Sequence, residues 1–129
     1  MPVIIREETP TGRPSGNVVI IDVPDTITLR DLIRIRIREE VARYNANPTD
    51  RFQGLVRPTE AEEDLNGYRM RSRRRIDWGQ QADAALEAFG HNGFFVLVAD
   101  RQVEDLDEML SLDEASDVAF VRLVPLAGG

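Results

Sequence analysis

The first 24 residues contain two β-branched runs separated by a segment rich in proline and glycine, and this feature restricts the fold more than any other. Residues 3–7 (VIIRE) and 18–24 (VVIIDVP) have the composition of strands. The segment between them, TPTGRPSGN, is typical of a turn. Because strands joined by a short loop pair antiparallel, we expect the chain to begin with a β-hairpin.

A long helix is predicted after the hairpin. Thr28 and Asp31 resemble a capping box, with Asp in place of the usual Glu or Gln. The run IRIRIR also alternates like a strand, but the cap, the length and REEVAR favour a helix. Pro48 ends it by residue 47. The apolar residues that recur at helical spacing are Leu29, Leu32, Ile33, Ile37, Val41 and Tyr44.

Residues 46–80 form an insert whose local signals are weak. TEAEEDLNG at 59–67 is interpreted as one short helix, with Thr59 as the cap, Glu62 at the third position and Gly67 as the stop. YRMRSRRRI at 68–76 alternates weakly and is interpreted as an extended segment. The insert is therefore expected to be helical in part.

The second half of the chain contains a helix and then strands. Asp77 is the expected cap of a helix over 78–90. FFVLV at 94–98 is predicted to be a strand buried on both faces, and Val103 a very short strand. Residues 118–124 are the predicted last strand. Between them lies a connector whose residues Met109, Leu110 and Leu112 are expected to point inwards.

The order of these elements is typical of an α+β fold in a single domain over 1–129. The first and last strands are both candidates for the centre of the sheet. If they are neighbours, their parallel pairing requires a long crossover, which the helix after residue 28 supplies.

Composition excludes several classes of protein. The absence of cysteine excludes a disulfide scaffold, thiolate metal sites and a catalytic thiol, and it fits a cytoplasmic location. No apolar run approaches the length of a membrane span, and the start lacks the pattern of a secretory signal. The net charge of −7 argues against general nucleic-acid binding. The lone histidine, His91, is interpreted as a helix-end or surface residue.

The basic residues are distinctive in type and in position. All 16 are arginine, so the chain offers no lysine amine for acylation, although a GC-rich genome would also favour arginine. Acidic residues gather between 104 and 117, so charge is unevenly distributed. The arginine cluster is interpreted as a solvated face or as a docking patch for an acidic partner, and it consists of Arg69, Arg71, Arg73, Arg74 and Arg75.

The element order and the last residues resemble the ubiquitin-like β-grasp family. TLRDLI at 28–33 looks like the start of the helix in small sulfur carriers. Residues 94–124 are similar to the second half of ubiquitin, and PLAGG at 125–129 resembles the carriers' tail. The resemblance implies a mixed sheet of four or five strands with a crossover helix. The insert at 46–80 has no counterpart in the small members.

The resemblance implies a role for each residue of a flexible tail, 125–129. Gly129 would carry the carboxylate that an activating enzyme adenylates with ATP and magnesium, and Gly128 would be the thin spacer. Leu126 and Ala127 would make shallow apolar contacts that set the register of the tail in the enzyme's channel, and Pro125 would help to end the strand. Ala127 stands where ubiquitin has arginine, so a dedicated activating enzyme is expected. Arg122 is a candidate contact for that enzyme or an ordinary outward-facing strand residue.

The same resemblance leaves three functions open. The first is a protein modifier joined to target amines, with an activating enzyme, a conjugating enzyme and an isopeptidase as partners. The second is a sulfur carrier with a C-terminal thiocarboxylate, and the third is a non-covalent adaptor. In each case the chain is not expected to be an enzyme, and no catalytic, metal-binding or cofactor-binding residue is assigned.

Overall fold

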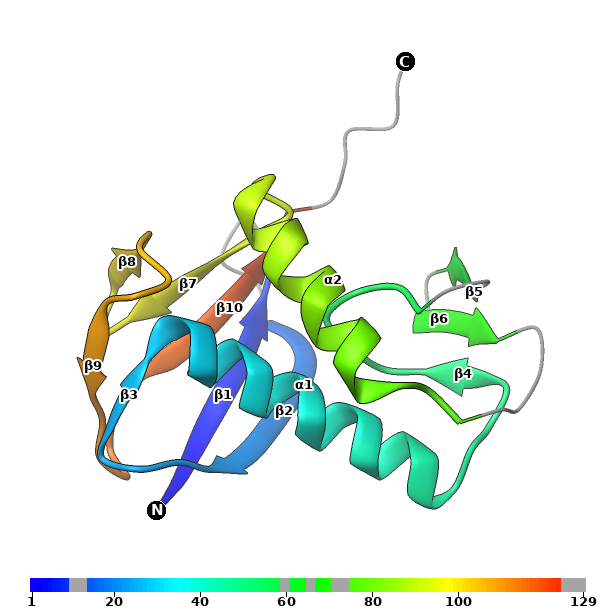
Figure 1. Ribbon diagram of the computed structural model, residues 1–129, viewed down its shortest axis with the longest axis horizontal. Helices are drawn as coiled ribbons and strands as arrows, with labels where there is room; N and C mark the ends of the chain where they lie inside the picture. The colour runs from blue at the N-terminus through cyan, green and yellow to red at the C-terminus, as the bar shows by residue number, and fades with distance from the viewer. Residues whose placement is uncertain (10–13, 59–60, 65–66, 71–74, 124–129) are drawn as a thin grey trace.

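A computed structural model describes residues 1–9, 14–58, 61–64, 67–70 and 75–123. Its main sheet is mixed and five-stranded, with the strand order β2-β1-β10-β7-β8 (Figure 1). The fold is therefore α+β, as the sequence predicts. The five strands are β1 (Pro2–Glu8), β2 (Pro14–Asp22), β7 (Phe94–Val98), β8 (Arg101–Val103) and β10 (Val118–Arg122).

The first and last strands are neighbours at the centre of this sheet. β1 and β10 run parallel, with Ile5 opposite Val118 and Glu7 opposite Phe120. β2 pairs antiparallel with β1, so the predicted hairpin is confirmed. β7 lies between β10 and β8. Of its five residues, only Phe94 and Val96 are buried, so the expectation of a strand buried on both faces is wrong.

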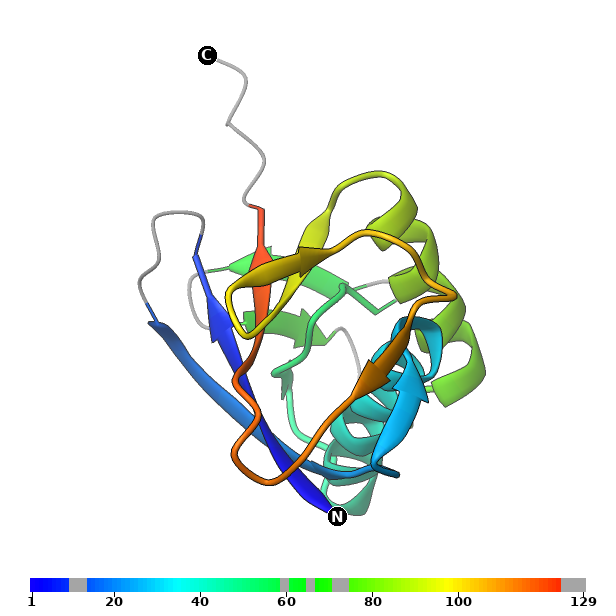
Figure 2. The ribbon, with the colours of Figure 1, turned by 90° about the vertical axis from the view of Figure 1, so that its left-hand side faces the viewer.

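Two helices cover one face of the sheet in the part of the chain that the structure describes, as Figures 1 and 2 show. α1 (Leu29–Ala46) carries the crossover from β2 towards the rest of the fold. Thr28 caps it as expected, because its hydroxyl accepts a hydrogen bond from the Asp31 amide at 3.2 Å. α2 (Trp78–Gly90) is capped by Asp77, which accepts from the Gly79 amide at 2.9 Å.

The insert contains a second sheet, so the short helix predicted over 59–67 is wrong. Its strand order is β4-β6-β5. Phe52 pairs with Tyr68 across two of these strands, and Ala61 pairs with Met70 across the other two. These side chains are buried together, and this non-local pairing outweighs the local capping signal. The strands are β4 (Arg51–Phe52), β5 (Ala61–Asp64) and β6 (Gly67–Met70).

A two-stranded ribbon joins the start of α1 to the connector before β10. It consists of β3 (Thr26–Thr28) and β9 (Met109–Ser111), which pair antiparallel. Leu110 and Leu112 are buried as expected, but Met109 is 62% exposed, so its predicted inward orientation is wrong. Strand geometry explains the difference, because alternate residues of β9 point to opposite faces.

Candidate functional site

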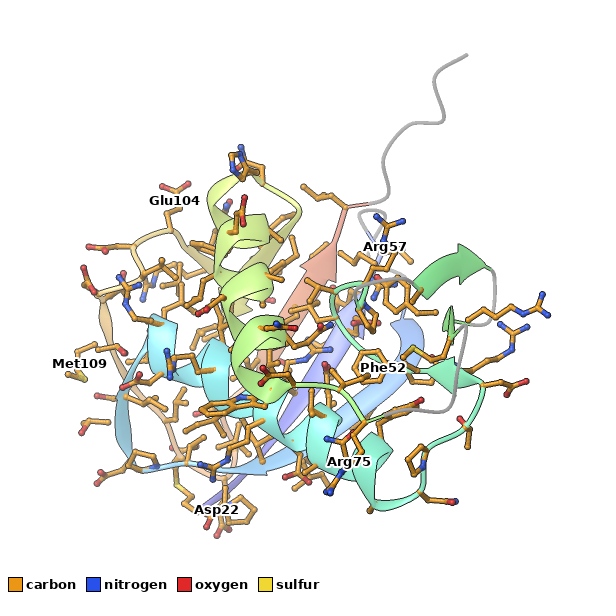
Figure 3. All side chains as sticks on the ribbon, turned by 45° about the vertical axis from the view of Figure 1, so that its right-hand side comes forward. Asp22, Phe52, Arg57, Arg75, Glu104 and Met109 are labelled. Carbon is orange, nitrogen blue, oxygen red and sulfur yellow. The ribbon has the colours of Figure 1, made fainter. Side chains whose placement is uncertain are left out.

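Most of the predicted tail and arginine positions lie outside the described residues. These are Pro125, Leu126, Ala127, Gly128, Gly129, Arg71, Arg73 and Arg74. Of the arginine cluster, Arg69 on β6 and Arg75 before α2 are described, and both side chains are exposed. Figure 3 shows Arg75 at the surface. β10 leads into the tail, so the end of this strand is the described region nearest to the predicted site, and we take it as the candidate site.

Arg122 points towards the insert rather than outwards. On β10 it shares a face with Val118 and Phe120, which are fully buried beneath the helices. Its Nη2 donates to the Leu55 carbonyl at 2.9 Å and also to the Gly54 carbonyl. Its Cζ lies 5.2 Å from the ring centroid of Tyr68. The expectation of an outward-facing strand arginine is therefore wrong.

A buried network of charges lies beside Arg122, and we call Glu7, Arg36 and Glu40 the buried triad. Arg36 on α1 donates to Glu40 at 2.8 Å and to Glu7 at 3.0 Å. Its guanidinium also lies 4.5 Å from the ring centroid of Phe120. All three side chains are at most 4% exposed. Ion pairs this deep are rare, because removing each charge from water is costly.

The triad is connected to the same loop of the insert that Arg122 binds. The second carboxylate oxygen of Glu40 accepts a hydrogen bond from the Leu55 amide at 3.1 Å. Leu55 therefore links two elements, because its amide donates to Glu40 of α1 and its carbonyl accepts from Arg122 of β10. A side chain at Gly54 would overlap the Phe52 ring and lie 3.0 Å from Glu40, so this close approach requires glycine.

Burial raises the pKa of Glu40 above its ordinary value, although Arg36 and the Leu55 amide act in the opposite direction. Within the described part of the chain, Nη1 of Arg36 has no hydrogen-bond partner. A cleft of about 380 Å³ lies alongside, between α1, β2 and β4, and Arg36, Glu40 and Phe52 are in its lining. The triad is thus an electrostatically costly feature at the junction of sheet, helix and insert.

Further polar contacts hold the insert against α1 and α2. The side chain of Asn45 donates to the Ile76 carbonyl at 2.9 Å and accepts from the Ile76 amide at 2.8 Å. The side chain of Gln81 donates to the Val56 carbonyl at 2.6 Å. Since the insert is held at Leu55, Val56 and Ile76, it and the end of β10 form one packed unit.

Sequence reasoning missed the triad, although the sequence contains a signal for it. Glu7 continues the inward alternation of Val3 and Ile5 along β1. Arg36 and Glu40 continue the buried stripe of α1. Charged residues on faces that are expected to be buried indicate that each needs a partner, although the pattern does not say which residues pair.

Among the described residues, no group of three or more His, Asp or Glu side chains is arranged to hold a metal ion. Neither described helix is long and apolar enough to cross a membrane. No protein-family model, no curated protein and no solved structure matches this chain. Any functional conclusion therefore depends on the chain's own geometry and chemistry.

Proposed function

We propose that this chain is a ubiquitin-like protein modifier, activated through ATP-dependent adenylation of Gly129 and joined to target amines. The observation that carries the proposal is the position of β10. The strand that leads into the Gly128–Gly129 tail lies at the sheet centre, parallel to β1. The strand order β2-β1-β10-β7-β8, with α1 crossing one face, is compatible with the β-grasp arrangement that the sequence resembles.

The base of the tail is well anchored, which supports this role. Arg122 holds the end of β10 to the insert, and the Leu123 amide donates to the Gly93 carbonyl at 3.1 Å. A tail that starts from a fixed point reaches a partner's active site at a smaller entropic cost than a tail on a mobile segment. Gly128 and Gly129 carry no Cβ, so they suit a narrow channel.

The proposed chemistry has three balanced steps. The Gly129 carboxylate attacks the α-phosphorus of ATP, an acyl–phosphate bond forms, and pyrophosphate leaves. A thiolate of a partner enzyme attacks the carbonyl carbon, and AMP leaves. A target amine then displaces the thiolate and forms an amide. This chain supplies the carboxylate, and its partners supply the catalytic groups.

The absence of lysine has a consequence for such a modifier. None of the 129 side chains carries a primary amine, because the sequence contains no lysine. No lysine side chain can therefore accept the carboxyl group of a second copy. We expect single modifiers on targets rather than lysine-linked chains.

The test compares the full chain with a variant that lacks Gly129, both with an N-terminal tag and both expressed in cells of the source organism. We expect the full chain to form larger adducts that survive a thiol reductant, and the variant to form none. Adducts on both proteins would contradict the proposal. A full chain that forms no adduct but gains about 16 Da, with sulfur replacing oxygen, would indicate the sulfur carrier instead.

A further inference from the structure

An apolar groove lies on the far side of α1 from the buried triad. It has a volume of about 310 Å³ and lies between the β3–β9 ribbon, the outer stripe of α1 and the first residue of α2. The groove, as we use the term, is formed by Ile27, Arg34, Ile35, Arg38, Trp78 and Met109. It shares no lining residue with the cleft beside the triad.

The groove exposes part of its apolar lining. Met109 is 62% exposed, and Figure 3 shows it at the edge of the molecule, directed away from the sheet. Trp78 and Ile35 are half-buried, while Ile27 is buried and forms the floor. Methionine and tryptophan are enriched at surfaces where proteins bind each other.

Two arginines beside the groove have no ion-pair partner among the described residues. These are Arg34 and Arg38, one turn apart on α1. Other arginines of the same helix do have partners, since Arg30 pairs with Asp107 at 3.2 Å and Arg43 with Glu39 at 3.3 Å. Among the described arginines of α1, the two without an ion-pair partner are therefore the two that line the groove, in a chain with 23 acidic residues.

Trp78 and Arg34 are already arranged against each other. The guanidinium carbon of Arg34 lies 5.5 Å from the indole centroid, and the indole N–H donates to the Arg34 carbonyl at 3.3 Å. The indole is therefore held in place, and it keeps the Arg34 guanidinium at the groove. Such preorganisation reduces the side-chain entropy that binding would cost.

We propose that the groove binds an acidic segment of a partner protein. The segment inserts one apolar side chain between Met109 and Trp78, and its flanking carboxylates pair with Arg34 and Arg38. Charge complementarity carries this assignment, because an apolar groove bordered by unpaired guanidinium groups matches an apolar residue flanked by Asp or Glu. Asp31 also lines the groove, at the N-terminal end of the α1 stripe, and its negative charge repels other carboxylates. The carboxylates of the bound segment are therefore expected to lie towards Arg38.

The proposal does not depend on the chemistry of the tail. A variant without Gly128 and Gly129 is expected to bind the same segment as tightly as the full chain does. Failure of one proposal is therefore distinguishable from failure of the other.

The test uses Trp78, which is the one tryptophan in the chain. The probe is a blocked hexapeptide with two glutamates on each side of a leucine–phenylalanine pair. Tryptophan fluorescence is recorded during titration at low and at high salt. We expect a saturable change that weakens at high salt. A peptide with lysines in place of the glutamates is expected to bind more weakly.

Matched variants locate the binding to the groove. We expect Arg38→Glu to weaken peptide binding about fivefold or more, while Arg57→Glu, an equal charge change on the exposed insert, leaves it unchanged. We expect Met109→Ser to weaken binding about fivefold, while Ile20→Ser, which removes another exposed apolar side chain, from β2, leaves it unchanged. All four positions are exposed, so the variants are expected to fold, and thermal unfolding checks this.

Three results would overturn the proposal. The first is no saturable binding of the glutamate peptide. The second is equal binding of the lysine peptide, or unchanged affinity in both groove variants. The third is concentration-dependent self-association of the full chain that Arg38→Glu abolishes, because a second copy would then be the occupant.

Discussion

Replacing Arg122 with methionine tests whether this arginine has a structural role. Methionine keeps an apolar stem of similar length, so the packing of β10 against the insert is largely retained. The guanidinium is lost, together with its bonds to the Gly54 and Leu55 carbonyls and its contact with the Tyr68 ring. The variant therefore isolates the polar connection between the last strand and the insert.

The expected loss of stability follows from these contacts. A hydrogen bond from a charged donor contributes about 1.5–3 kcal/mol, and a cation–π contact adds about 0.5–2 kcal/mol. Both hydrogen bonds come from one nitrogen, and relief of the buried charge offsets part of the loss. We expect the unfolding free energy to fall by about 2–3 kcal/mol.

Urea unfolding of the purified protein measures this change, with Arg57→Met as the matched control on the exposed surface of the insert. The control is expected to change stability by less than about 0.5 kcal/mol. Hydrogen exchange at the Leu55 amide, which donates to Glu40, should accelerate in Arg122→Met alone. Equal stability of the two variants would refute the structural role, and Arg122 would then again be a candidate contact for a partner enzyme.

Two further predictions concern α1. The folded pKa of Glu40 lies above its ordinary value, so the native state binds this proton more tightly than the unfolded state does, and the contribution of Glu40 to stability declines as pH rises from the ordinary glutamate pKa towards the folded pKa. In Glu40→Gln this decline should be shallower than in the wild type, as urea unfolding across pH measures, and an equal slope would refute it. Thr28→Ala should lose about 1 kcal/mol through the lost helix cap, whereas Thr26→Ala on the exposed side of β3 should lose little in the same assay.

Local patterns predicted most of the elements correctly. The β-branched runs became β1 and β2, and the Thr28 and Asp77 caps start the two helices. IRIRIR forms a helix because Leu32, Ile33 and Ile37 then share the buried stripe of α1. These features depend on contacts within a few residues, which is why the sequence reveals them.

The errors occurred where distant residues determine the outcome. Thr59, Glu62 and Gly67 match a capped helix, yet the neighbouring Tyr68 pairs with Phe52 across a sheet. Met109 lies in an apolar stretch, but the pairing of β9 with β3 turns it outward. A local preference of a few tenths of a kcal/mol is smaller than the gain from burying several side chains in a shared core.

The sequence by itself determined the α+β class, the two caps, the lack of lysine and the Gly128–Gly129 pair that motivates the proposed function. Only the tertiary structure decided which partners the buried arginines have. Arg36 pairs with Glu7, which is 29 residues away in the chain, and Arg122 donates to the carbonyl of Gly54, which is 68 residues away. Spacing along the chain does not encode such partners. They are selected when the helix and the insert close over the sheet, because a charge that becomes buried there must be paired or hydrogen-bonded.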